Sequence, residues 1–206
     1  YTTEFFTDKM LEYLRSSDGD SPWFAYVSYN AVHWPLMLPD EWLDRNAGRY
    51  DDGYDVLREQ RVSRATELGV VPAGLPLEYF SAVAEPWERL STDERARISR
   101  AQEVYAGLVE HTDMSIGRLI EYLDESGQLE NTVVMLMADH GGSAADSGVD
   151  TGRLPTVANL RGLDSSEVDN SLENFGRDGS FIDHGIGFGE AASAPFRHFK
   201  ATLSEG

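Results

Sequence analysis

Asp139 and His140 stand side by side where the sequence changes abruptly from apolar to polar residues. Together they offer one carboxylate oxygen and one imidazole nitrogen, a common pairing for a divalent cation in proteins. Gly141 and Gly142 follow them and allow the backbone to turn sharply beside the two side chains. The residue types therefore indicate a metal site. A turn-forming aspartate followed by a hydrogen-bonded histidine is the plainer interpretation.

Two further side chains could take part in the same chemistry. His33 lies in a short loop that ends at Pro35, and Lys200 lies at the end of a segment with three basic side chains, 197–200. The formal net charge is −19, so a local group of cations in this chain suggests a role in binding an anion. A structural loop histidine and a basic helix start that balances the acidic remainder are the alternatives.

Two apolar runs could bring these residues together. Residues 132–138 carry no charge, Gly or Pro, which predicts a strand buried on both faces, and residues 22–29 predict a second one. Parallel neighbours finish at the same edge of a sheet, where ligands collect in α/β proteins. We therefore expect an α/β fold, with a mostly parallel sheet flanked by helices, in which His33 and Asp139 share one edge.

Helices are predicted before each of these strands. Thr2 or Thr3 is expected to cap a helix whose apolar positions run to Leu14. Ser91 and Glu94 form a capping signal for a long helix that reaches about Ser126. Helix, short turn and buried strand in this order are typical of the α/β class.

The remaining regions contribute less to the chemistry. Residues 39–100 predict a charged, largely helical excursion, either a packed surface helix pair or a cover over the sheet edge. Residues 185–189, Gly-Ile-Gly-Phe-Gly, are expected to form a flexible loop, because a dinucleotide-binding loop would follow a strand and have a different spacing.

Composition excludes several functions. The chain has 206 residues and 41% hydrophobic residues, so it can bury a core. It has no cysteine, which excludes disulfides and thiolate metal sites and leaves the compartment undecided. The negative charge argues against nucleic acid as a partner, and the sequence has no apolar run long enough to cross a membrane. The oligomeric state cannot be read from the sequence.

Several segments, taken in order, resemble the sulfatases and are most similar to the bacterial arylsulfatases. Ala31-Val32-His33-Trp34-Pro35-Leu36 is similar to the family's histidine loop. The other similar segments are Tyr105 to Asp113, Ile116 to Arg118, Asn131-Thr132 with the strand that ends at Asp139, Asp169 to Asn174, and Ala194 to Lys200. The resemblance covers nearly the whole chain and implies an alkaline-phosphatase-like α/β fold.

The resemblance also implies roles for four residues. Asp139 matches a metal-binding carboxylate and His33 a histidine that contacts the sulfate and protonates the leaving oxygen. Lys200 matches a lysine that holds sulfate oxygens. His140 differs from the asparagine usual in calcium-dependent arylsulfatases and matches the Asp-His-Gly form of related phosphatases, phosphonate monoester hydrolases and choline sulfatases. Calcium is the metal that the resemblance implies, and His140 makes Mn or Zn an alternative.

The resemblance further implies that residues 1–206 are the central part of a sulfatase catalytic domain. The family opens with two metal-binding aspartates and a C/S-x-P-x-R motif whose Cys or Ser becomes formylglycine, and no such region precedes His33 in this chain. Ser193 to Arg197 fits the pattern S-x-P-x-R, but it follows His33 and Asp139, so we interpret it as coincidental. The expected parent is a metal-assisted hydrolase of small sulfate esters, and the chain alone is expected to be inactive. A phosphatase or phosphonate monoester hydrolase, or a non-catalytic binding fragment, remains the alternative.

Overall fold

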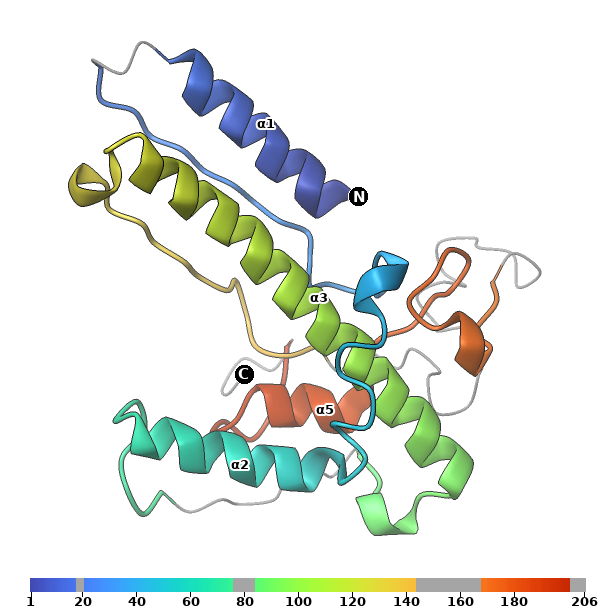
Figure 1. Ribbon diagram of the computed structural model, residues 1–206. Helices are drawn as coiled ribbons and strands as arrows, with labels where there is room; N and C mark the ends of the chain where they lie inside the picture. Colours follow the sequence, from blue (N-terminus) through green and yellow to red (C-terminus); the bar gives the residue numbers. More distant parts are fainter. Residues whose placement is uncertain (18–20, 76–83, 144–167, 201–206) are drawn as a thin grey trace.

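The computed structural model describes residues 1–17, 21–75, 84–143 and 168–200. The α-helices of these residues are α1 (Thr2–Ser16), α2 (Gly53–Glu67), α3 (Thr92–Glu125) and α5 (Gly185–Ala192). Short 3-10 helices lie at η1 (Asp40–Trp42), η2 (Trp87–Arg89), η3 (Leu129–Asn131) and η5 (Leu172–Asn174). Helix α3 crosses the whole molecule, with α1 beside its second half and the α2–α5 pair beneath its first half (Figure 1).

The long helix α3 forms where its local signals predict. Ser91 is its N-cap, and the Ser91 side chain accepts a hydrogen bond from the Glu94 amide at 3.2 Å. The Glu94 carboxylate accepts one from the Ser91 amide at 2.7 Å, so the predicted capping box is confirmed. Gly127 follows the helix with a φ of 70°, a left-handed conformation that glycine adopts readily. Local chemistry is thus sufficient to set both ends of α3.

Helix α1 forms as predicted, but its cap differs from the prediction. Tyr1 is the N-cap and makes no side-chain capping bond, so the predicted threonine cap is wrong. Thr3, Thr7 and Leu11 are the buried residues of α1. The Thr7 hydroxyl donates to the Thr3 carbonyl oxygen at 2.9 Å and lies 2.8 Å from the Tyr29 hydroxyl. Packing against α3 and against the segment that carries Tyr29 therefore decides which face of α1 is buried.

The hydrophobic core lies between the first half of α3 and the α2–α5 pair. Its buried members come from residues 36–108 and 175–191: Leu36, Leu38, Trp42, Leu43, Tyr54, Trp87, Ile98, Ala101, Val104, Leu108, Phe175, Ile182, Phe188 and Ala191. Burial of such side chains is the main favourable term in folding, about 1.5–3 kcal/mol for a fully buried large one. The excursion at 39–100 therefore belongs to the core through Trp42, Tyr54 and Trp87 and is more than a surface cover.

Residues 185–189 form the first turns of α5, and the predicted flexible loop is wrong. The low helix propensity of glycine favoured a loop. The packing explains the helix, because a Cβ on Gly187 would collide with the ring of Tyr54 in α2. Phe188, the next residue, is completely buried and meets Tyr54 edge to face at 5.7 Å between ring centroids. The glycines thus let α5 pack closely against α2.

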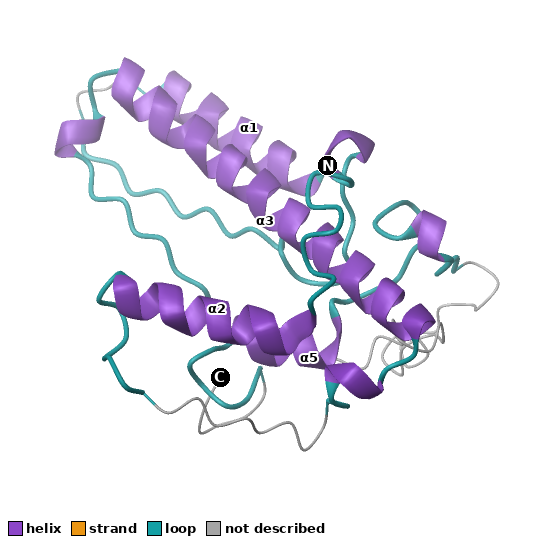
Figure 2. Ribbon diagram, turned by 60° about the horizontal axis from the view of Figure 1, so that its bottom comes forward, coloured by secondary structure: helices purple, strands orange, loops and turns teal. Residues whose placement is uncertain are grey.

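The two predicted strands are extended but form no sheet. Residues 22–29 and 132–138 run as loops beside α1 and α3, and no β-strand occurs within the four described ranges (Figure 2). Val133 is 88% exposed and Met137 76% exposed, so the predicted burial on both faces is also wrong. A strand needs a partner backbone along at least one edge, and the described residues make no ladder hydrogen bonds with these segments. The parallel sheet is therefore not confirmed.

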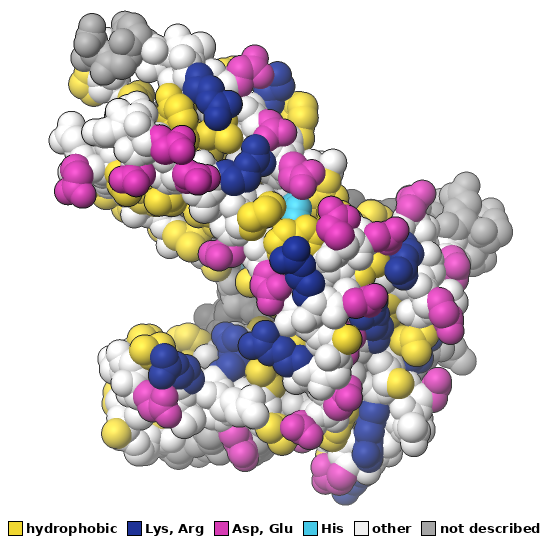
Figure 3. Space-filling view, viewed as in Figure 1, with side chains coloured by type: hydrophobic (Ala, Val, Ile, Leu, Met, Phe, Trp, Pro, Cys, Tyr) yellow, Lys and Arg dark blue, Asp and Glu magenta, His cyan; other side chains and the backbone are white. Residues whose placement is uncertain are grey.

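The face of the molecule shown in Figure 3 carries both acidic and basic side chains and contains a hollow. Acidic and basic side chains alternate over the face shown in Figure 3, and a hollow separates the α1–α3 pair from α2. None of the helices in the described parts of the chain is long and apolar enough to cross a membrane.

Candidate active site

Three segments distant in sequence meet around the predicted residues. The first segment follows His33. Its Leu36 amide donates to the Ile182 carbonyl oxygen at 3.0 Å, and its Leu38 amide donates to the Gly176 carbonyl oxygen at 2.9 Å. The second follows Asp139, where the Gly142 carbonyl oxygen accepts from the Lys200 amide at 2.9 Å. Residues 169–200 form the third segment and are bonded to both of the others. Backbone hydrogen bonds, rather than a shared sheet edge, therefore bring the candidates together.

His33 and Lys200 are in direct contact. The Lys200 Nζ lies 2.9 Å from the His33 Nε2, although 167 positions separate the two residues. The His33 Nδ1 lies 2.7 Å from the Trp34 carbonyl oxygen, which can only accept, so Nδ1 carries a proton. The Nε2 is then free to accept a hydrogen bond from the Lys200 ammonium in the neutral imidazole. The Lys200 ammonium, which can bind an anion, and the His33 imidazole, which can transfer a proton, thus lie side by side on an exposed surface.

Asp139 and His140 lie at the end of the extended segment 132–138. The side chain of Asp139 is 87% exposed, and its Oδ2 is 3.3 Å from the His140 Nε2. The His140 Nδ1 is 2.7 Å from the Gly141 carbonyl oxygen, so it donates there and leaves the Nε2 lone pair available. The two side chains therefore turn an oxygen and a nitrogen toward the same space.

This pair fits part of a metal site. Two ligand atoms 3.3 Å apart can share a cation with bonds of about 2.0–2.2 Å, and a metal-bound histidine usually donates its other N–H to a carbonyl, as His140 does. A complete site needs more donors, and no group of three or more His, Asp or Glu side chains suited to a metal occurs among the described residues. Asp139 and His140 could supply two ligands of a shared site.

Ser193 has a structural role in this arrangement. Its hydroxyl accepts a hydrogen bond from the Gly142 amide at 2.9 Å and donates to the Gly189 carbonyl oxygen at 3.2 Å. It is also buried and caps the C-terminal end of α5. A hydroxyl engaged on both sides is poorly placed to attack a substrate. These contacts agree with the interpretation of the S-x-P-x-R match as coincidental.

Gly142 carries a stability prediction, because its Cα faces the end of α5. A Cβ at this position would lie closer than 3.0 Å to the Gly189 carbonyl oxygen and 3.0 Å from the Ala192 Cβ. We expect Gly142→Ala to lower the free energy of unfolding by about 1–3 kcal/mol, the usual cost of overpacking. Denaturant unfolding of the full-length protein measures this change.

Gly117 provides the matched control. It lies in α3, and no atom lies within 4 Å of the Cβ that alanine would add. Gly117→Ala should therefore stabilise the protein by about 0.5–1 kcal/mol through helix propensity. Equal effects of the two substitutions on the free energy of unfolding would contradict the close approach at Gly142.

Sequence reasoning missed the support that α2 gives to this region. Arg58 is buried, and its guanidinium donates to the Glu190 carbonyl oxygen at 3.0 Å and to that of Phe196 at 2.8 Å. Arg61 donates to the Ala192 carbonyl oxygen at 3.1 Å. Cations are favourable at a helix C-terminus, so these arginines stabilise the end of α5 and the segment leading to Lys200.

A second missed pair is Asp183 and His184, which are buried directly beneath the 139–143 loop. A signal for them was present in the sequence. The tripeptide Asp-His-Gly occurs at 139–141 and again at 183–185. The first copy is exposed and the second is buried, a difference that the sequence pattern does not reveal.

A groove elsewhere on the surface does not fit the predicted chemistry. It has a volume of about 560 Å³ and lies along the second half of α3. Three carboxylates and three large apolar residues line it, namely Asp113, Glu121, Asp124, Ile116, Ile120 and Leu129. The carboxylates would repel an anionic substrate, and none of the candidate residues reaches this groove.

Comparison of the sequence with known proteins shows the family of this chain. The sulfatase family profile matches residues 1–165. The chain belongs to the sulfatase family. The match includes His33, Asp139 and His140 and ends before Lys200. Members of the family generally use a metal ion and formylglycine.

Individual sulfatases extend the similarity to the C-terminal segment. An uncharacterized sulfatase of Schizosaccharomyces pombe is 36% identical over 209 aligned residues, which cover 100% of this chain and 36% of that protein. An arylsulfatase of Klebsiella aerogenes is 30% identical over 99% of this chain and 42% of its own length. A multifunctional alkaline phosphatase superfamily protein of Trinickia caryophylli is 27% identical over 69% of this chain and 27% of its own length. The chain therefore spans about two fifths or less of the length of these relatives.

Proposed function

We propose that the protein containing this chain hydrolyses small sulfate esters, with aryl sulfates as the first substrate class to test. The contact between His33 and Lys200 carries the proposal, since it joins a proton-transfer group and a compact cation from distant parts of the sequence at 2.9 Å. Membership of the sulfatase family and the similarity to a protein named arylsulfatase support the same reaction. A sulfate monoester is a small anion that a local cation can bind within an acidic protein.

The proposed roles follow from the chemistry of the two side chains. The Lys200 ammonium binds sulfate oxygens and neutralises charge on the transferring group. When a sulfate oxygen replaces His33 as the partner of Lys200, the freed Nε2 takes up a proton from solvent, and the imidazolium then donates this proton to the oxygen of the leaving alcohol or phenol. The S–O bond breaks as that proton transfers. The hydrogen bond from Nδ1 to Trp34 holds the ring so that Nε2 faces the substrate.

Asp139 and His140 are proposed to hold a divalent cation together with ligands from elsewhere. A bound cation would polarise the sulfate and make the attacking group more acidic. The carboxylate favours calcium, whereas the imidazole of His140 is better suited to manganese or zinc. The hydrogen bond from His140 to Gly141 supports this role, because it leaves Nε2 free for the metal.

We further propose that the 206-residue chain does not supply the attacking group. It contains no cysteine, and the serine of its S-x-P-x-R match is engaged by Gly142 and Gly189. The formylglycine used in the family therefore has no evident precursor among these residues. His33, Lys200, Asp139 and His140 would then act on a sulfate ester only within the longer protein.

Comparing two proteins tests this proposal. The full-length protein should hydrolyse 4-nitrophenyl sulfate, and the 206-residue chain should show no turnover above background, because it lacks a nucleophile. Release of 4-nitrophenol measures both, with metal supplied and then removed by a chelator.

Three results would contradict it. Turnover by the 206-residue chain would return Ser193 to consideration, which Ser193→Ala would then test. An inactive full-length protein would favour a binding function. Activity that is insensitive to the chelator would remove Asp139 and His140 from the proposed metal site.

A phosphatase or phosphonate monoester hydrolase is the second candidate. His140 after Asp139 favours it, as does the similarity to a relative named as a multifunctional alkaline phosphatase superfamily protein. The ratio of kcat/KM for 4-nitrophenyl sulfate and 4-nitrophenyl phosphate distinguishes the two functions. We expect the sulfate to be the better substrate, and a reversed ratio would select the second candidate.

A further inference from the structure

Asp183 and His184 form a buried polar pair next to the candidate site. Asp183 is 1% exposed and His184 is fully buried. Buried ionisable groups are costly unless they are hydrogen-bonded, so such a pair calls for an explanation. Neither residue belongs to the segments that predicted the candidate site, and neither has a role in the proposed reaction.

Both side chains of the pair bind the same residue of the 139–143 loop. The His184 Nε2 lies 2.9 Å from the Ser143 carbonyl oxygen, and the Ser143 hydroxyl donates to the Asp183 Oδ2 at 2.8 Å. The other carboxylate oxygen of Asp183 accepts from the His184 amide at 2.7 Å. The backbone carbonyl and the side chain of Ser143 are therefore both held from below.

The surroundings of His184 fix the position of its Nε2 proton and the orientation of its ring. A carbonyl oxygen only accepts, so the His184 Nε2 must carry a proton. The Nδ1 lies 3.0 Å from the Gln102 side-chain Oε1, and the ring stacks on Tyr105 at 4.2 Å between centroids with planes 16° apart. Burial lowers the pKa of His184, although Asp183 and the Ser143 carbonyl oppose this shift. The Nε2–H is therefore directed at Ser143, and the ring cannot rotate without losing its partners.

The loop held in this way connects the proposed metal residues to Lys200. Asp139 and His140 begin it, and Ser143 is held by the buried pair at its end. Between them, the Gly142 carbonyl oxygen accepts from the Lys200 amide at 2.9 Å. A shift of Ser143 would therefore move the attachment point of Lys200 together with both proposed ligands.

We propose that Asp183 and His184 are positioning residues, which fix the 139–143 loop so that Asp139, His140 and Lys200 keep one relative arrangement. This inference rests on the proposed function for its effect on catalysis, but its effect on the loop can be measured separately. Apolar residues of similar size could fill the same space without the cost of burying polar groups. The hydrogen bonds of the pair instead reach into a loop, where they can restrict motion.

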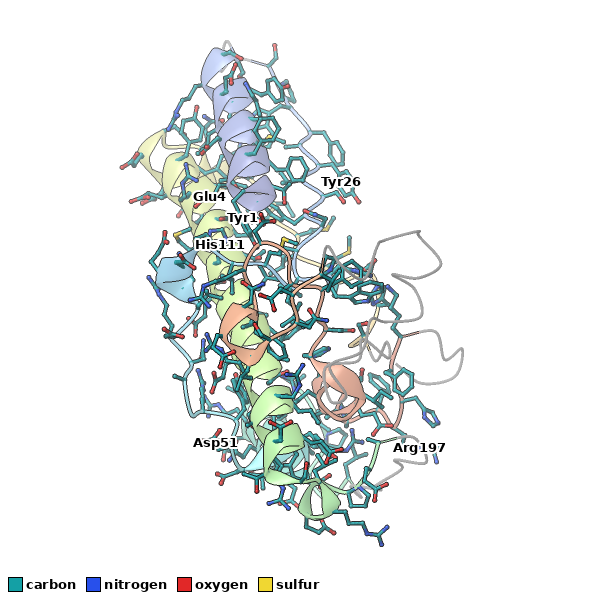
Figure 4. The ribbon with its side chains drawn as sticks, turned by 90° about the vertical axis from the view of Figure 1, so that its right-hand side faces the viewer. Tyr1, Glu4, Tyr26, Asp51, His111 and Arg197 are labelled. Atoms are coloured by element: carbon teal, nitrogen blue, oxygen red, sulfur yellow. The ribbon has the colours of Figure 1, made fainter. Side chains whose placement is uncertain are left out.

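His111 provides a matched control for a substitution of His184. It too is fully buried, contacts aromatic rings and lies within 3.2 Å of a carboxylate, that of Glu4. His111 lies against the start of α1 beside Tyr1 and Glu4, well separated in Figure 4 from Arg197 on the segment that carries Lys200. Both histidines can be changed to phenylalanine, which keeps a ring and removes its hydrogen bonds.

The experiment compares His184→Phe and His111→Phe in the full-length protein. We expect His184→Phe to lower kcat/KM for 4-nitrophenyl sulfate by about 10- to 100-fold, because displacing a positioned group by about 1 Å can have this effect. It should also speed hydrogen exchange in residues 139–143, measured by mass spectrometry. His111→Phe should leave both quantities near wild type.

Two further variants separate positioning from general destabilisation. Ser143→Ala removes only the hydroxyl that binds Asp183, so it should cause a smaller change in the same direction even if His184→Phe folds poorly. In a Lys200→Ala background, His184→Phe should cost less than it does alone, because both act on one arrangement.

The outcomes distinguish this inference from the proposed function. Unchanged exchange in residues 139–143 of both His184→Phe and Ser143→Ala would overturn the positioning role, whatever the activity. Equal losses of kcat/KM in His184→Phe and His111→Phe would do the same. A wild-type protein without sulfatase activity would contradict the proposed function alone, while faster exchange in the two loop variants would still support the positioning of the loop.

Discussion

Replacing Lys200 with alanine in the full-length protein is expected to lower kcat/KM for an aryl sulfate by about 10²–10³-fold, the usual effect of removing one preorganised electrostatic group. The reason is the location of its ammonium, which lies 2.9 Å from His33 and has its backbone amide fixed to Gly142. Steady-state kinetics with 4-nitrophenyl sulfate measure the loss. Lys200→Arg should restore only part of the activity, because a planar guanidinium cannot replace a compact ammonium in this contact.

The chain contains a natural control, because it has only two lysines. Lys9 lies on the exposed face of α1, where it forms an ion pair with Glu12 at 2.6 Å. Such exposed pairs contribute little, so Lys9→Ala should leave kcat/KM near wild type. If Lys200→Ala also kept near-normal kinetics, Lys200 would be removed from the proposed site and only His33 and the metal residues would remain.

Replacing His33 with alanine should have the other large effect, and this effect should depend on the leaving group. General acid catalysis contributes about 10²–10⁴-fold in rate, and the full contribution is expected for a poor leaving group such as 4-methylphenol. With 4-nitrophenol, which leaves without much help, the loss from His33→Ala should be much smaller. A series of aryl sulfates with different leaving groups measures this difference. The dependence of kcat/KM on leaving-group pKa should be steeper in His33→Ala than in the wild-type protein.

The slope of that series decides the role of His33. A steeper slope in His33→Ala means that the histidine donates a proton to the leaving oxygen. An equal loss with all leaving groups would contradict this role and would instead indicate that His33 only orients Lys200. His33→Gln keeps a side-chain amide that can accept from the Lys200 ammonium, so it should preserve more of the contact with Lys200 while it still lacks proton transfer.

The sequence determined those features that depend on neighbouring residues. Ser91 and Glu94 satisfy each other's backbone amides, and Gly127 adopts the left-handed conformation that ends α3, so this helix could be predicted at both ends. The apolar runs at 22–29 and 132–138 predicted buried strands, of which only the extended path of the chain is seen (Figure 2). The candidate residues His33, Asp139, His140 and Lys200 were selected from residue type and from resemblance to a family, which needs no coordinates.

Tertiary structure decided the features that depend on distant partners. Whether an extended segment becomes a buried strand depends on neighbouring strands, and none lies beside Val133 or Met137 within the described residues. Gly187 lies in a helix because the close packing of α5 against Tyr54, which a side chain at this position would prevent, outweighs the loop preference of glycine. The two Asp-His-Gly tripeptides are identical in sequence, but only that at 183–185 is covered by the core. Burial and hydrogen bonding to Ser143 make the second copy a support for the loop that follows the first, because a buried polar side chain must bond to whatever group the fold places beside it.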